Sequence, residues 1–242
     1  MKQPFRSNIL PFFTIAAGGL GLALRFWLYA GIDEKGLLPA GHPANYALFL
    51  LTALTLGVLF LATRELTPRR VNKTFLRVFG AVAYGLAGMC LILTAVFELS
   101  GNMFRLAWVA VAAALIGGLI LLVMAVLRFF RKRLSYWFSA IITVVLMLNT
   151  VAQCQIWGAE PQLQEYFFPL LASIFLILSA YEKTKFAAMQ GDARKLAFFS
   201  QAALFFCFVS LNTAHWLLYL GMMLWAAVQF FPCIFTKRRP AA

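Results

Sequence analysis

Residues 106–127 read LAWVAVAAALIGGLILLVMAVL and contain no charged or amide side chain. The chain becomes basic directly after this stretch, with Arg128, Arg131, Lys132 and Arg133 in close succession. An α-helix needs about 20 predominantly apolar residues to cross the hydrocarbon core of a bilayer. The stretch therefore predicts a transmembrane helix that ends at a basic loop.

The rest of the chain repeats this pattern. Of its 242 residues, 63% are hydrophobic and only 12% are charged, whereas a soluble domain carries about 25% charged residues. We therefore expect an all-α, polytopic membrane helix bundle that forms a single transmembrane domain over residues 1–242, with about eight helices in four hairpins. The expected spans are residues 9–30, 44–63, 78–99, 106–127, 137–157, 166–181, 197–212 and 215–236. The sixth and seventh of these look short for a span.

Positive charge is distributed unevenly along the chain. Most of the 21 Lys and Arg residues lie near the two ends of the chain and in alternate gaps between the apolar stretches. The positive-inside rule then places both termini in the cytoplasm of a cell membrane, which we expect to be a bacterial cytoplasmic membrane. This placement explains the net charge of +13 without nucleic acid. It also predicts contact between the basic loops and anionic lipid headgroups at the cytoplasmic face.

A weak repeat of two halves, residues 1–125 and 126–242, is a further prediction. The segment Tyr29-Ala-Gly-Ile-Asp33 resembles the segment Ile156-Trp-Gly-Ala-Glu160, since each ends an odd-numbered span with a glycine and an acid. Four spans in each half would make the two halves parallel repeats.

Two ionisable residues within the predicted spans stand out, Arg25 and Glu98. Such residues are costly in a membrane, and each is therefore a candidate functional residue. Helical spacing places Thr14, Gly18 and Gly21 on the same face as Arg25. Both charges lie at a similar depth, and an Arg25–Glu98 pair would neutralise both at the outside end of the bundle. The alternatives are that Arg25 extends to the interface and that Glu98 lies among the headgroups.

Amide side chains are unusually dense at the end of the fifth predicted span. Asn149 and Gln153 are four residues apart and share a helix face, and Gln155 follows them. This face should point into the bundle, where it would form either a polar wall for a solute or hydrogen bonds between helices. Asn212 and His215 lie in the turn before the last span and complete the predicted polar set.

The sequence indicates no metal site and no cofactor. Its two histidines, His42 and His215, have no spacing that requires a metal. The sequence contains no C-x-x-C, H-E-x-x-H or G-x-S-x-G motif. Glu98 and His215 are the only residues that could supply an acid or a base.

The predicted polar residues gather toward the outside ends of the spans, whereas the inner half is comparatively bare, with Gln201 its main polar member. Our first hypothesis is a small transporter, or the membrane-embedded subunit of one, with an outward-facing pocket for a small polar or anionic solute or a lipid headgroup. The second is a non-catalytic partner subunit or sensor that binds another membrane protein or a second copy of the chain. The third and least favoured is a lipid-modifying enzyme. The predicted ligand-binding residues are Arg25, Glu98, Asn149, Gln153, Gln155, Asn212 and His215.

Overall fold

The computed structural model describes residues 9–31, 41–64, 73–100, 107–130, 135–157, 166–213 and 215–234. Within these ranges the chain forms eight α-helices and a short 3₁₀ helix, η2, with no strand. The helices are α1 (Ile9–Ala30), α2 (Pro43–Arg64), α3 (Lys73–Ser100), α4 (Ala107–Phe129), α5 (Tyr136–Trp157), α6 (Phe167–Ala187), α7 (Ala193–Val209), η2 (Ser210–Asn212) and α8 (Trp216–Ile234).

The all-helical architecture fits a protein that is embedded in a membrane. Seven of the described helices are long and apolar enough to cross one, and residues Trp216–Gln229 of α8 form a shorter apolar helix. Large apolar side chains are exposed along the outside of the bundle, among them Phe12, Leu50 and Val126. A surface of this kind suits lipid better than water.

The prediction that the sixth and seventh spans are short is wrong. Helix α6 continues past the charged residues Glu182 and Lys183 to Ala187, and α7 begins at Ala193. The Asp192 side chain caps the start of α7, because its Oδ1 accepts a hydrogen bond from the Arg194 backbone N–H at 2.9 Å. Hydropathy falls where charges begin, but a helix can continue through charged residues until a cap ends it.

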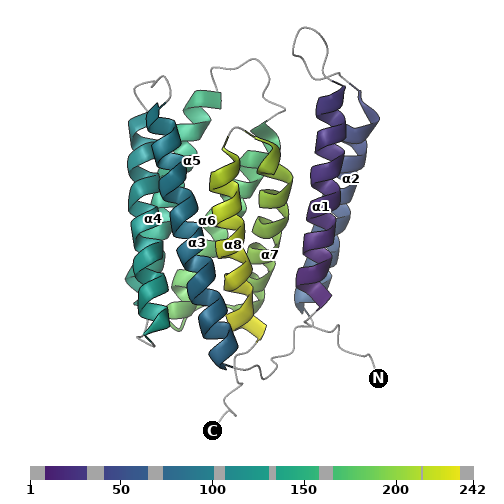
Figure 1. Ribbon diagram of the computed structural model, residues 1–242. Coiled ribbons are helices and arrows are strands. Elements are labelled where there is room, and N and C mark those ends of the chain that lie inside the picture. The colour runs from purple at the N-terminus through teal and green to yellow at the C-terminus, as the bar shows by residue number, and fades with distance from the viewer. Residues whose placement is uncertain are drawn as a thin grey trace, which may run out of the picture.

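Consecutive helices run in opposite directions, so the bundle has two ends (Figure 1). We call one the Arg25 end, where α1 finishes and α8 starts. We call the other the basic end, where the described residues Arg64, Arg128, Lys183 and Arg194 lie. Predictions about the basic segments 65–72 and 131–134, about Asp33 and Glu160, and about both termini lie outside the described residues. The two-half repeat stays a prediction.

Helix α7 is the centre of the bundle. It contacts α1, α2, α6 and α8, and almost every side chain from Gln201 to Cys207 is buried. Helix α3 packs against α4 and α8 on the other side. Helices α7 and α8 therefore lie between α1 and α3 (Figure 1).

Glycines allow the helices of this bundle to pack closely. A Cβ atom on Gly88 of α3 would lie 2.8 Å from the Gly118 carbonyl oxygen of α4, and one on Gly118 would lie 2.9 Å from the Gly88 carbonyl oxygen. Gly18 and Gly21 of α1 similarly receive side chains of α7. The small-residue faces are thus used inside this chain, as is common for membrane helices.

Candidate functional site

The predicted polar face of α1 is buried as a whole. Thr14, Gly18, Gly21 and Arg25 are all inaccessible, which confirms the face read from helical spacing. Because the two glycines bring α1 against α7, the guanidinium of Arg25 reaches the end of α7. Its Nη1 donates a hydrogen bond to the Val209 carbonyl oxygen at 3.1 Å. Only 2% of Arg25 is exposed, so it does not extend to the surface.

Aromatic rings surround the same guanidinium. Its Cζ lies 5.7 Å from the ring centre of Tyr29 and 5.9 Å from that of Phe168 on α6. Its Nη2 also donates to the Tyr29 hydroxyl at 3.5 Å. Contacts of a cation with ring faces gain strength when water is excluded. Arg25 is therefore a buried cation held by α1, α6 and α7.

Tyr219 of α8 connects Arg25 to the amide face of α5. Its buried hydroxyl lies 3.4 Å from Oε1 of Gln153 and 3.5 Å from the Pro169 carbonyl oxygen. The hydroxyl also lies near Ser173 and within electrostatic range of Arg25. We call this group the Arg25 cluster, and its members are Arg25, Tyr29, Gln153, Phe168, Pro169, Ser173 and Tyr219.

The Gln153 side chain is enclosed and incompletely bonded. It is 1% exposed, and its Nε2 has no hydrogen-bond partner among the described residues. An unsatisfied buried donor costs about 1–3 kcal/mol. Asn149 is 7% exposed on the same face, so the prediction that this face points inward is confirmed. Gln155, by contrast, is exposed, and the structure does not bring it into the cluster.

Glu98 pairs with His215 rather than with Arg25. Its Oε1 lies 3.2 Å from Nδ1 of His215, which directly precedes α8. The predicted Arg25–Glu98 pair is therefore wrong: α1 and α3 lie on opposite sides of the α7–α8 pair. A similar depth in the membrane does not make two helices neighbours.

The Glu98–His215 pair lies in a pocket of about 260 Å³ between α3 and the start of α8, lined by Thr94, Phe97, Glu98, His215, Trp216 and Leu217. We call it the Glu98 pocket. Asn212 lies half-buried in η2, next to α1, α6, α7 and α8. Of the predicted set, Arg25 and Gln153 thus belong to the Arg25 cluster, and Glu98 and His215 belong to the Glu98 pocket. No described hydrogen bond joins Asn149, Gln155 or Asn212 to either place.

A second polar cluster lies toward the basic end, where the sequence did not predict one. The Lys183 ammonium bonds to the hydroxyl of the fully buried Tyr84. Its Nζ lies 4.8 Å from the Tyr84 ring centre and 5.6 Å from the Trp225 ring. The Arg128 guanidinium lies 5.3 Å from the Tyr84 ring centre, and the Gln229 side chain lies near the Tyr84 hydroxyl. We call these five residues the Tyr84 cluster.

Sequence reasoning missed this cluster because it assigned Lys183 and Arg128 to cytoplasmic loops. Each side chain starts near a helix end and reaches back between the helices, as long basic side chains can. The available signal was the presence of Tyr84 and Gln229 inside otherwise apolar stretches.

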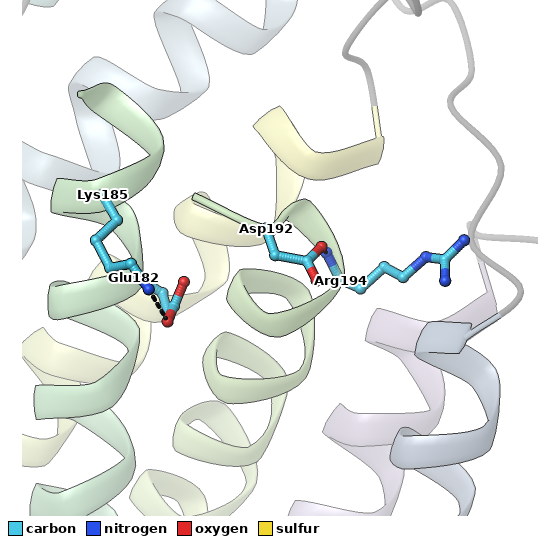
Figure 2. A network of polar contacts seen from close by, with 4 residues as sticks. All are labelled: Glu182, Lys185, Asp192 and Arg194. Atoms are coloured by element: carbon cyan, nitrogen blue, oxygen red, sulfur yellow. Dashed lines mark hydrogen bonds and ion pairs between the residues drawn. The ribbon is translucent and has the colours of Figure 1, made fainter. Parts of the chain in front are cut away.

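Other polar residues are buried in the same half of the bundle. Gln201 has neither amide atom bonded among the described residues, and the same holds for the Ser179 hydroxyl and for Oε2 of Glu182. Oε1 of Glu182 forms an ion pair with Lys185 at 3.1 Å, close to the Asp192 cap of α7 (Figure 2). The prediction that this half is comparatively bare, with Gln201 its main polar member, is therefore wrong.

No protein family model, curated protein or solved structure matches this chain. Its function must therefore be argued from the two clusters and the pocket.

Proposed function

We propose that this chain is a small membrane transporter, or the membrane-embedded subunit of one, that binds a small anionic or polar solute at the Arg25 cluster. In this proposal all eight helices span a cell membrane, the basic end lies in the cytoplasm with both termini, and the Arg25 end faces outward. The alternation of basic segments along the sequence supports this orientation.

The observation that carries the proposal is the unbonded Nε2 of the buried Gln153, whose contact Tyr219 lies within electrostatic range of the buried Arg25. Buried polar groups are nearly always hydrogen-bonded, so a native exception points to strain, a bound group or a functional role. In this proposal a carboxylate or phosphate accepts hydrogen bonds from the Gln153 amide and from the guanidinium. Guanidinium groups suit such planar anions well.

The Tyr84 cluster supports transport over binding alone. Tyr219 and Gln229 lie on the same helix, α8, at a separation of about 15 Å along its axis for a rise of 1.5 Å per residue. The first belongs to the Arg25 cluster and the second to the Tyr84 cluster. A solute released from Arg25 would thus meet two further cationic side chains, Arg128 and Lys183, toward the basic end.

The test compares two arginine variants in the purified full-length chain. Thermal unfolding is followed in the presence of acetate, phosphate, sulfate, succinate and glutamate, and small molecules that co-purify are identified by mass spectrometry. We expect at least one anion to stabilise the wild type, and Arg25→Ala to lose this stabilisation. Arg25→Lys should retain part of it, since it keeps the charge but loses the planar fork.

Arg64→Ala is the matched control. Arg64 lies at the last position of α2 with its guanidinium 5.0 Å from the Phe60 ring, outside both clusters. It should respond to anions as the wild type does. The proposal fails if Arg25→Ala keeps the full response, or if no anion acts on the wild type and a second protein chain co-purifies instead. An anion that passes this test is then assayed for uptake into proteoliposomes.

A further inference from the structure

The structure assigns a second binding site to the Glu98 pocket, and we infer that its ligand is an organic ammonium group. This inference goes beyond the proposed transport of an anion and concerns different residues. The pocket lies at the Arg25 end, but it opens between α3 and α8 rather than between α1, α6 and α7. At about 260 Å³ it is close to the lower limit of pockets that hold small molecules.

The charged group that can recognise a cation here is Glu98. A carboxylate has two oxygens with about four acceptor positions, and the contact with His215 uses Oε1. Oε2 can therefore accept from a ligand N–H or face a quaternary ammonium while the pair with His215 persists. Half-burial of the pair keeps some water out of the pocket, and this strengthens an ionic contact relative to one in bulk water.

The walls of the pocket suit the same ligand. Phe97 and Trp216 are both lining residues, and ring faces attract quaternary ammonium groups, with tryptophan the most effective. Thr94 lies one helical turn before Glu98 and donates its hydroxyl hydrogen to the Cys90 carbonyl oxygen at 2.9 Å. Its oxygen is thus left as an acceptor, which suits a primary ammonium as well.

An anion fits this pocket poorly. Glu98 would repel it, and His215 balances that charge only when the imidazole is protonated. The Glu98 pocket and the Arg25 cluster should therefore bind ligands of opposite charge. The ammonium group could belong to a free amine or to the headgroup of a phospholipid in the adjacent leaflet, since both carry the same chemistry.

Two arms of one experiment distinguish these sources. In the first, equilibrium binding of radiolabelled choline to the full chain is measured in maltoside detergent. In the second, the chain is reconstituted in vesicles of equal parts phosphatidylcholine, phosphatidylethanolamine and phosphatidylglycerol, re-extracted, and analysed for retained lipid. Saturable choline binding would identify a free amine, whereas selective retention of the choline or ethanolamine lipid would identify a headgroup.

Choline binding or lipid retention supports the inference only if it depends on residues of the Glu98 pocket. Glu98→Gln keeps the shape and removes the charge, and it should weaken binding at least tenfold or abolish the lipid selectivity. Trp216→Leu should weaken binding by about threefold, in line with the strength of an exposed cation–π contact. Trp27→Leu and His42→Gln are matched controls: both residues lie at the same end, and their rings pack against each other 5.4 Å apart, outside the pocket.

The inference is overturned if the wild type neither binds choline nor selects a lipid, or if Glu98→Gln behaves as the wild type. Anion-dependent stabilisation is measured on the same samples. A Glu98→Gln protein that keeps its anion response is folded, so a loss of ammonium binding in it belongs to the pocket. Failure of the anion response at Arg25, with ammonium binding intact, would instead refute the proposed function alone.

Discussion

The guanidinium of Arg128 occupies the space that a side chain on Gly80 would need. A Cβ atom at position 80 would overlap both Cζ and Nε of Arg128. The absence of a side chain at Gly80 of α3 thus leaves room for Arg128, in the last turn of α4, to reach the Tyr84 ring. Close contact between Gly80 and the long side chain of Arg128 thus holds a cation inside the Tyr84 cluster.

We predict that Gly80→Ala moves Arg128 away from Tyr84. The arginine is flexible enough to leave, so the free energy of unfolding should fall by no more than about 1–2 kcal/mol. Uptake of the transported anion should fall as far as it does in Arg128→Ala. Because both changes remove the same contact, combining them should add little beyond either alone, as a double-mutant cycle would show.

Gly57→Ala is the control for this prediction, because no atom lies within 4 Å of a Cβ placed on Gly57. It should leave uptake unchanged and stabilise the helix slightly, by about the 1 kcal/mol that separates glycine from alanine in a helix. Additive effects of Gly80→Ala and Arg128→Ala would show that the glycine acts on something other than this arginine.

A second prediction concerns the contact of α3 with α4. Gly88→Ala should destabilise the protein by about 1–3 kcal/mol, because the new methyl would meet the Gly118 carbonyl oxygen and backbone cannot move aside as a side chain can. The measurement is unfolding in detergent, compared with Gly19→Ala, where a Cβ has no neighbour within 4 Å. Equal stability of the two variants would contradict the close backbone approach.

The positions of the helices along the chain could be predicted because each depends on the local sequence, namely on an apolar run and the basic residues next to it. The predicted span 9–30 coincides with α1, and 106–127 differs from α4 by one or two residues at each end. The prediction failed at the end of α6, because helix propensity and capping, rather than hydropathy, decide where a helix stops. Glu182 and Lys185 lie within the helix and even form an ion pair there.

The candidate site was predictable only within single helices. Spacing placed Arg25 with Gly18 and Gly21, and Asn149 with Gln153, since residues on one helix face share a fixed geometry. It could not reveal that Glu98 meets His215, because that contact depends on which helices are neighbours. It also could not place Lys183 on Tyr84, since a long side chain at a helix end can turn either into the bundle or away from it.

Our third prediction is that Met189→Gly stabilises the protein. Met189 follows α6 with a φ of 65° and is 93% exposed, so its side chain contributes little packing. The backbone N–H groups of Met189 and Gln190 donate to the Phe186 and Lys185 carbonyl oxygens, which is the Schellman ending where glycine is preferred. Relief of the left-handed conformation should add about 1 kcal/mol to the free energy of unfolding.

Gln190→Gly is the control for Met189→Gly. Gln190 does not have a positive φ, so glycine there only increases the freedom of the unfolded chain and should destabilise slightly. Measurement of both variants by thermal unfolding separates the conformational effect from a general effect of glycine in this turn. A loss of stability in Met189→Gly would argue against the left-handed ending.

The fourth prediction separates a structural role of the Gln153–Tyr219 contact from a binding role. Tyr219→Phe removes the donor that faces Oε1 of Gln153 and leaves both ends of a buried amide unbonded, so it should cost about 1–3 kcal/mol. Adding Gln153→Leu should return the stability to that of the wild type or raise it further, because replacing both buried polar partners with apolar groups can be neutral or stabilising. Stability is measured without added anion.

The same double variant should lose its response to the anion that stabilises the wild type. This result would be a double variant that is at least as stable as the wild type but no longer binds the anion. It would show that the buried amide lowers the stability of the protein and is kept for binding, as is expected of a functional site. If the double variant is instead less stable than Tyr219→Phe, Gln153 serves to hold α5 to its neighbours. The polar wall of α5 would then belong to the packing of the bundle, and Arg25 alone would remain to contact the solute.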